Sequence, residues 1–270
     1  MTKFHLHLVS DATGETISAV AKATLVQFEA AEPIEHLWTM VRSKSQLAHV
    51  IESIAENPGL VLFTIVDHTL REYLIDECRR RQIASVSVLD PVLAALGAYL
   101  GAKVQERPGR QHAMDADYFQ RIDAMHFCMS HDDGQGLDHV AEADVVLVGV
   151  SRTSKTPTCI YLANRGIKAA NVPMVPDLPF PDSLGSDSDQ LVVGLTASPE
   201  RLVQIRRNRL LALSADAETD YVNIEAVKKE TTDARRMFAD RGWPVIDVTR
   251  RSIEETAAAV MTLLARRAES

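Results

Sequence analysis

The chain has 270 residues, a formal net charge of −8 and 46% apolar residues. This length suits two α/β domains of ordinary size. The acidic balance argues against nonspecific binding to nucleic acid or to a membrane surface, because both need a clustered positive field. No apolar run approaches the ~20 residues that cross a bilayer. The polar amino terminus is also unlike a secretory signal, so we expect a cytoplasmic protein.

The three cysteines, Cys78, Cys128 and Cys159, are odd in number and have no C-x-x-C spacing. This pattern excludes a disulfide framework and a cysteine-rich zinc site. It is typical of reduced thiols in a cytosolic protein.

The first hundred residues alternate short apolar strands with helical patterns. Strands are predicted at 4–9, 35–41, 60–66 and 84–89, and helices at 16–28, 45–56, 70–81 and 91–100. The run 60–66 is apolar almost throughout, which indicates a strand buried on both faces. Alternating elements of these lengths predict a doubly wound, mostly parallel sheet. Ligands of such sheets bind beyond the carboxyl ends of the strands.

Polar residues stand where these predicted strands end: Ser10, Asp11, Thr13, Asp67, His68 and Asp90. Before the first helix, Ser10, Asp11 and Thr13 are expected to act as helix caps. A second anion site at the amino terminus of that helix is the functional alternative.

Composition changes after Gly101. The stretch 103–113, KVQERPGRQHA, is polar, contains a proline and a glycine, and lacks periodicity. We therefore predict a linker over residues 105–113. It separates an amino-terminal α/β domain, 1–104, from a catalytic domain, 114–270, which is predicted to be a P-loop kinase-like α/β domain.

The second half continues the alternation. Helices are predicted at 115–129, 158–164, 221–241 and 253–267 and after Pro199, and strands at 145–149, 170–175, 191–195 and 245–248. Residues 176–190 are rich in proline, aspartate and serine, so we expect a loop that faces the substrate.

A candidate phosphate-binding loop joins the strand at 145–149 to the next helix. It consists of Gly149, Val150, Ser151, Arg152, Thr153, Ser154, Lys155 and Thr156. In such a loop the backbone N–H groups converge on an anion, a lysine neutralises phosphate charge, and a threonine hydroxyl reaches Mg²⁺. Compared with the pattern G-x-x-x-x-G-K-[ST], only Ser154 departs, because it replaces the second glycine. The structural alternative is an ordinary turn with Pro157 opening the helix.

The segment His131-Asp132-Asp133-Gly134 lies close to that loop in sequence. Two adjacent carboxylates can supply a general base for a hydroxyl group or ligands for Mg²⁺. A turn with solvated acids is the alternative.

A basic helix follows the predicted strand at 191–195. Arg206 and Arg209 are three positions apart, so a helix places them on one face. Small kinases keep lid arginines at such a place to bracket the transferring phosphate. The alternative for each arginine is a solvated surface position.

Several segments resemble one family, the regulatory proteins of pyruvate, phosphate dikinase and the related regulators of phosphoenolpyruvate synthase. They are LVSDATGET, HDDG, GVSRTSKTPTCIYLANRGIKAAN, LTASPERLVQIRRNR and VIDVTRRSIEETA. The resemblance covers nearly the whole chain, and its most specific segment is GVSRTSKTP. Serine at position 154 is within the variation of that family.

The resemblance implies two activities in one protein. The family members are ADP-dependent kinases that inactivate the dikinase by phosphorylating a threonine, and Pi-dependent pyrophosphorylases that remove the same phosphate as PPi. Our hypothesis for the residues is that the loop holds the β-phosphate of ADP, that Lys155 offsets charge on the transferring group, and that Thr156 holds a divalent metal, Mg²⁺. Asp132, or its neighbour Asp133, then takes the proton of the threonine hydroxyl. A homodimer is possible.

Three alternatives stay open. The first is the same chemistry on phosphoenolpyruvate synthase. The second is a nucleotide-sensing binding module that holds ADP without turnover. The third is a kinase of a small metabolite.

Overall fold

The computed structural model describes residues 2–105, 116–175, 180, 184, 190–212 and 220–269. The chain forms two compact units, Met1–Ala113 and Met114–Ser270, each with its own sheet and its own core. Of the predicted linker, 105–113, only Gln105 lies within the described residues. The loop predicted over 176–190 lies outside them except at Phe180, Leu184 and Gln190.

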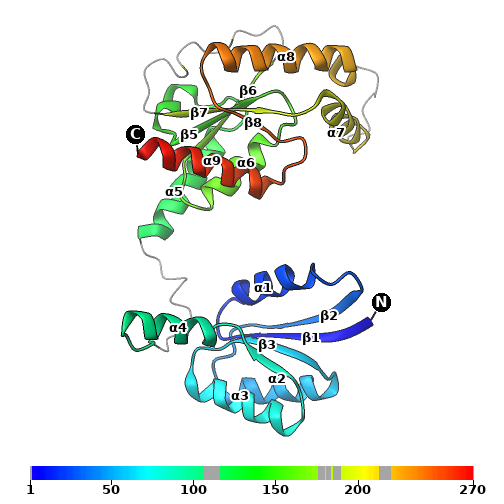
Figure 1. The fold of residues 1–270 in the computed structure, drawn as a ribbon, viewed down its shortest axis with the longest axis vertical. Helices are drawn as coiled ribbons and strands as arrows, with labels where there is room; N and C mark the ends of the chain where they lie inside the picture. Colours follow the sequence, from blue (N-terminus) through cyan, green and yellow to red (C-terminus); the bar gives the residue numbers. More distant parts are fainter. Residues whose placement is uncertain are drawn as a thin grey trace. The chain divides into compact units, whose positions relative to one another are not determined.

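Unit 1 contains β1 (Thr2–Ser10), α1 (Glu15–Leu25), β2 (Ala31–Trp38), α2 (Lys44–Glu56), β3 (Gly59–Thr64), α3 (His68–Arg80), β4 (Ser85–Ser87) and α4 (Asp90–Leu100). The strands are parallel and are ordered β2-β1-β3-β4. Helix α1 covers one face of the sheet, and α2 and α3 cover the other (Figure 1). The predicted parallel, doubly wound sheet is therefore confirmed for this unit.

Strand β2 begins and ends earlier than predicted. It starts at Ala31, and Pro33 fits within it because β2 is an edge strand whose proline need not donate to a neighbour. After Trp38 the chain leaves the sheet, and Met40 adopts a left-handed backbone with φ 56°.

Strand β3 is enclosed less evenly than its apolar sequence predicts. Val61 and Phe63 are buried against α2 and α3. Leu60 and Leu62, on the face covered by α1, are only partly buried. One helix covers that face and two cover the other, so the side chains of β3 are buried to different extents on the two faces.

The predicted caps of α1 are wrong for Ser10 and Asp11. The N-cap residue is Gly14, with φ 83°, and no side chain caps this helix. The Ser10 hydroxyl instead accepts a hydrogen bond from the Thr64 hydroxyl at 3.0 Å. The Asp11 carboxylate accepts one from the Val66 N–H at 2.7 Å. These contacts tie the carboxyl end of β1 to that of β3.

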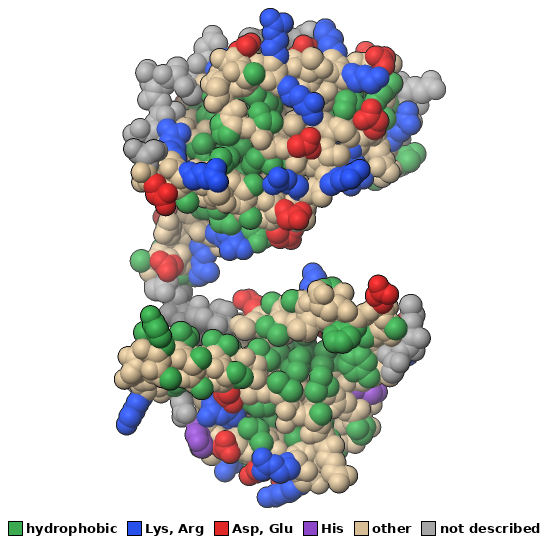
Figure 2. All heavy atoms as spheres, in the orientation of Figure 1, with side chains coloured by type: hydrophobic (Ala, Val, Ile, Leu, Met, Phe, Trp, Pro, Cys, Tyr) green, Lys and Arg blue, Asp and Glu red, His purple; other side chains and the backbone are tan. Residues whose placement is uncertain are grey.

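Asp67 caps α3, because its carboxylate accepts a hydrogen bond from the Leu70 N–H at 2.9 Å. Helix α4 is unusual, since none of its residues is buried although its sequence is largely apolar. Tyr99 is 88% exposed, and Figure 2 shows apolar side chains at the surface over this helix.

Unit 2 contains α5 (Ala116–Ser130), η2 (Leu137–Glu142), β5 (Val145–Gly149), α6 (Lys155–Ala163), β6 (Ala169–Pro173), β7 (Leu191–Thr196), α7 (Pro199–Ala212), η3 (Asp220–Val222), α8 (Ile224–Asp240), β8 (Val245–Asp247) and α9 (Ile253–Ala268). Its strands are also parallel, in the order β6-β5-β7-β8. Helices α5, α6 and α9 lie on one face, and α8 lies on the other (Figure 1).

The core of unit 2 surrounds β5 and β7, in which every residue is buried. Gly194 of β7 lets α8 approach closely, because a Cβ there would lie 2.5 Å from the Phe238 ring. Helix α6 begins at Lys155, before Pro157. Proline is tolerated in a first helical turn, where its missing N–H would have no partner within the helix.

Both units reverse their strand order beside their first strand, between β1 and β3 and between β5 and β7. Such a reversal opens a crevice at the carboxyl ends of the two strands, where α/β proteins bind ligands. Within the described ranges, no helix combines the length and apolarity needed to cross a membrane. All three cysteines are free and buried.

Candidate functional site

The predicted loop lies at the strand-order reversal of unit 2. Gly149 ends β5, and a Cβ there would stand 2.5 Å from the Leu195 carbonyl oxygen, so only glycine fits. Arg152 and Ser154 have left-handed backbones, with φ 72° and 60°. Between them Thr153 is buried, and its hydroxyl donates to the Val150 carbonyl at 2.9 Å. Alternating backbone handedness turns successive N–H groups toward one point, which is an anion-binding geometry.

Lys155 opens α6 and is buried, with 6% of its surface exposed. Its ammonium group folds back over the loop and donates to the Val150 carbonyl at 3.1 Å. Burial lowers the pKa of Lys155 to about 8, although the negative charge of Asp133 and Asp132 opposes this change. A buried cation of this kind gains stabilisation when an anion binds beside it.

The structure brings the two carboxylates of the HDDG segment to this lysine and to Thr156. The Thr156 hydroxyl donates to Asp132 Oδ1 at 2.9 Å. Asn171 Nδ2 lies 2.6 Å from Asp132 Oδ1, 3.2 Å from Asp133 Oδ1 and 3.0 Å from Thr156 Oγ1. The amino terminus of α6, the HDDG turn and β6 therefore meet in one polar cluster.

Backbone pairing with β6 holds the HDDG turn in place. The Gly134 N–H donates to the Asn171 carbonyl at 2.9 Å, and the Asn171 N–H donates to the His131 carbonyl at 3.0 Å. His131 itself is buried and stacks on Phe127 with ring centroids 3.8 Å apart. Its role is to pack the turn, and it does not join the carboxylates.

The cluster fits a magnesium ion by the chemistry of its donors. Thr156, Asp132 and Asn171 offer hydroxyl, carboxylate and amide oxygens, which hard cations prefer. Asn171 is 1% exposed, and its Oδ1 has no hydrogen-bond partner within the described residues. The described part of the chain contains no group of three or more His, Cys, Asp or Glu side chains placed for a metal. Mg²⁺ commonly needs only one or two carboxylates, because substrate phosphates complete its shell.

The two predicted lid arginines lie in different environments. Arg206 is 1% exposed and pairs with Glu230 through contacts of 2.8 and 3.1 Å. It also donates to the backbone carbonyls of Ser151 and Tyr221, each at 3.1 Å. Arg209 is exposed and takes part in none of these contacts. Arg206 thus supports the loop from within the protein, and the two arginines do not share one exposed face.

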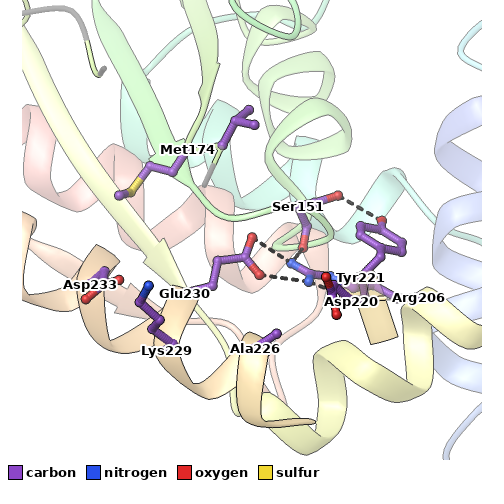
Figure 3. Close-up of a pocket in the computed structure, with 10 residues that line it drawn as sticks. Ser151, Met174, Arg206, Asp220, Tyr221, Ala226, Lys229, Glu230 and Asp233 are labelled. Atoms are coloured by element: carbon purple, nitrogen blue, oxygen red, sulfur yellow. Dashed lines mark hydrogen bonds and ion pairs between the residues drawn. The ribbon is translucent and has the colours of Figure 1, made fainter. Parts of the chain in front are cut away.

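Two cavities formed by described residues border the loop. The larger, of about 660 Å³, lies beside Ser151, whose hydroxyl is 2.9 Å from the Tyr221 hydroxyl. Figure 3 shows the paired Arg206 and Glu230 in its wall. The smaller, of about 260 Å³, is bordered by Arg152 and Ser154 of the loop.

Sequence reasoning missed Asn171, Glu230 and Tyr221, which contact the predicted site residues. A polar residue within the small, buried strand AANVP was a signal for Asn171. Glu230 and Tyr221 gave no such signal, because their contacts to Arg206 and Ser151 bridge 15 to 70 positions of chain.

The chain matches the kinase/pyrophosphorylase family over residues 6–261. It is 56% identical to a protein of Paramagnetospirillum magneticum, over 100% of this chain and 86% of that protein. It is 55% identical to a protein of Caulobacter vibrioides, over 97% of this chain and 84% of that protein. It is 53% identical to a protein of Sphingopyxis alaskensis, over the full length of both chains. Each relative bears the provisional name pyruvate, phosphate dikinase regulatory protein.

Among solved structures, a mitochondrial ornithine carbamoyltransferase from Coccidioides immitis matches 93% of this chain and 73% of its own. Its identity of 10% and TM-score of 0.25 are too low to carry an argument about fold.

A loop of this geometry with a buried lysine, on a parallel α/β sheet, suits an enzyme that handles phosphate. The chain belongs to the kinase/pyrophosphorylase family, which confirms the resemblance read from its sequence. Membership implies the use of nucleotide and phosphate.

Proposed function

We propose that this protein is an ADP-dependent protein-threonine kinase and Pi-dependent pyrophosphorylase that acts on pyruvate, phosphate dikinase in the cytoplasm. Family membership and the names of the relatives support the two activities and the target. The observation that carries the proposal is the 2.9 Å hydrogen bond between Thr156 and Asp132, which joins the phosphate-binding loop to a carboxylate. In this proposal residues 114–270 form a P-loop kinase-like catalytic domain and residues 1–104 a separate amino-terminal domain.

In the kinase direction the N–H groups of residues 149–156 hold the β-phosphate of ADP, and Lys155 neutralises its charge. Asp132 takes the proton of the target threonine, whose oxygen attacks the β-phosphorus as AMP leaves. General-base assistance of this kind contributes about 10²–10⁴ in rate. Positioning and charge neutralisation by the loop supply further stabilisation of the transition state.

In the reverse direction the loop holds the phosphate of the phosphothreonine. The aspartate takes the proton of Pi, the oxygen of Pi attacks that phosphorus, and the bond to the threonine oxygen breaks. The aspartate then gives the proton to the threonine oxygen. The products are the free threonine hydroxyl and PPi.

With Asp132 as the base, Thr156 and Asn171 would hold Mg²⁺, which would neutralise charge on phosphate oxygens. Asn171 orients both aspartates of the turn through Nδ2, so it positions the base whether or not the metal is bound.

Mass spectrometry of the target tests this proposal. The purified chain is incubated with ADP, the dikinase and phosphoenolpyruvate, and we expect a new phosphothreonine on the dikinase. Addition of Pi should then remove the phosphate and release PPi. Phosphate on phosphoenolpyruvate synthase alone would change the assigned target. ADP binding without transfer to either protein would establish a nucleotide-sensing module.

A further inference from the structure

The smaller cavity at the loop is lined by arginines. Arg152 of the loop, Arg201 of α7, and Arg250 and Arg251 between β8 and α9 contribute to its wall, and none of the described residues that line it is acidic. We call it the arginine pocket. It adjoins the carboxyl ends of β5, β7 and β8, beside the strand-order reversal of unit 2, where α/β proteins bind ligands.

The charges of this pocket are not neutralised by carboxylates in contact with them. Within the described part of the chain, none of its four arginines forms an ion pair, and Arg201 donates to the neutral side chain of Gln204 at 3.0 Å. Two carboxylates bind other groups of the wall: Asp247 accepts from Thr249, and Glu255 accepts from the Ser252 N–H at 2.8 Å. Asp247 interacts with Arg251 only at longer range. Arginines that line one pocket and contact no carboxylate suit a phosphate group, because guanidinium binds its oxygens in pairs.

The larger cavity beside Ser151 has a different character. Lys229 lines it together with Asp220, Glu230 and Asp233, and Figure 3 shows these three acidic side chains spread along the cavity wall. Carboxylates in the wall repel a phosphate. Of the two cavities at the loop, the arginine pocket is therefore the better site for a second phosphate.

The two proposed reactions need one second phosphate each. In the kinase step the bond between the β-phosphorus and the bridging oxygen breaks, and AMP leaves with that electron pair on its α-phosphate. In the pyrophosphorylase step an oxygen of Pi forms a bond to the phosphorus of phosphothreonine. In-line transfer places the attacking and leaving oxygens on opposite sides of the transferring group. The α-phosphate of AMP and the attacking Pi consequently occupy the same position relative to the loop.

We propose that the arginine pocket is this shared position, binding the α-phosphate side of ADP in the kinase direction and Pi in the pyrophosphorylase direction. The inference rests on the proposed function, and it adds that AMP and Pi exclude one another from a single subsite.

Competition on the native protein tests the inference directly. The release of PPi from the phosphorylated dikinase is measured against Pi concentration at several fixed concentrations of AMP. We expect AMP to raise the KM for Pi and to leave kcat unchanged. A fall in kcat at unchanged KM, or no effect of AMP, would overturn the shared subsite.

Substitution localises the subsite. Arg250→Gln and Arg251→Gln should each raise the KM for ADP and the KM for Pi together, by about 10-fold or more, as expected for a lost charge-assisted hydrogen bond. Arg207→Gln on α7 is the matched control, because Arg207 is exposed and does not line the cavity. An increase confined to one of the two ligands would show that they bind separately.

Calorimetric binding of AMP to the full chain, with and without Pi, separates the two hypotheses because it needs no turnover. Mutual exclusion that Arg251→Gln weakens would support the subsite even if no phosphate reached the dikinase, and only the proposed function would then fail. Phosphate transfer in both directions with independent binding of AMP and Pi would refute the subsite and leave the proposed function intact.

Discussion

The two units have the same strand order, but different residues stand at the crevice where that order reverses. In unit 1, Ser10 and Asp11 at the end of β1 accept hydrogen bonds from Thr64 and Val66 across the crevice between β1 and β3. In unit 2 the crevice between β5 and β7 holds a buried lysine with a lowered pKa, and it adjoins arginines that form no ion pair within the described residues. The comparison teaches that topology supplies a place for a ligand, whereas unsatisfied charge near that place indicates that one binds.

Removal of the Lys155 charge should have the largest effect on activity of the substitutions considered for the two crevices. Lys155→Ala should lower both the kinase and the pyrophosphorylase rate by about 10³, because one phosphate site serves both. Rates are measured by phosphothreonine formation and by PPi release. Asp11→Asn, at the equivalent crevice of unit 1, is the control and should leave both rates unchanged. Full pyrophosphorylase activity in Lys155→Ala would refute the single phosphate site.

The two aspartates of the HDDG turn provide the next largest effect. Asp132→Asn should lower kcat by about 10² with ADP binding retained, because a general base is lost while the phosphate loop stays intact. Asp133→Asn is the matched variant and should lower kcat less. Turnover is compared with ADP affinity measured by calorimetry. If ADP binding alone were lost, the pair would serve a metal or the local structure.

The buried ion pair under the loop gives a prediction about stability. Arg206→Met should lower the free energy of unfolding by about 3–5 kcal/mol, because it leaves Glu230 buried without its partner. Arg209→Ala, on the same helix but exposed, should change it by less than about 0.5 kcal/mol. Urea unfolding followed by circular dichroism measures both. Equal effects of the two substitutions would contradict the different environments described for them.

A dependence on pH should have opposite signs for activity and for stability. Above about 8 the Lys155 ammonium loses its proton, so kcat/KM for Pi should fall as pH rises through that value. Between about 8 and the ordinary value of 10.5 the unfolded chain binds more protons than the folded one. The contribution of this group to stability therefore rises with pH in that window. Rate profiles and urea midpoints test the two signs, and a flat rate profile would contradict the first.

Much of the fold follows from local sequence. Alternating apolar runs and helical patterns predicted the parallel sheet of unit 1 and the α/β alternation of unit 2. The glycine, lysine and threonine of the loop predict an anion site, which stays a prediction. The meeting of Thr156 with Asp132 was anticipated only as nearness in sequence. Residues whose roles depend on contacts between distant segments, such as Glu230 and Tyr221, could not be predicted, because no local pattern encodes a partner 24 or 70 positions away.

The remaining differences between prediction and structure concern the caps of α1 and the arginines of α7. The predicted caps Ser10 and Asp11 link two strands instead, because Gly14 supplies the turn into α1 without a side chain. Arg206 and Arg209 share a helix, yet only Arg206 points into the core, since burial depends on what packs against each face of the helix.

The left-handed residues of the loop have a consequence for its dynamics. Arg152 and Ser154 adopt this backbone conformation without being glycine, at a cost of about 1–2 kcal/mol each. Their side chains also restrict the unfolded chain, so ordering the loop loses less conformational entropy than it would with glycine at both positions. The loop is therefore stiff before any anion arrives. In the proposed function, two ligands as different as a nucleotide and a phosphothreonine can use such a loop in turn, because neither has to spend binding energy on shaping it.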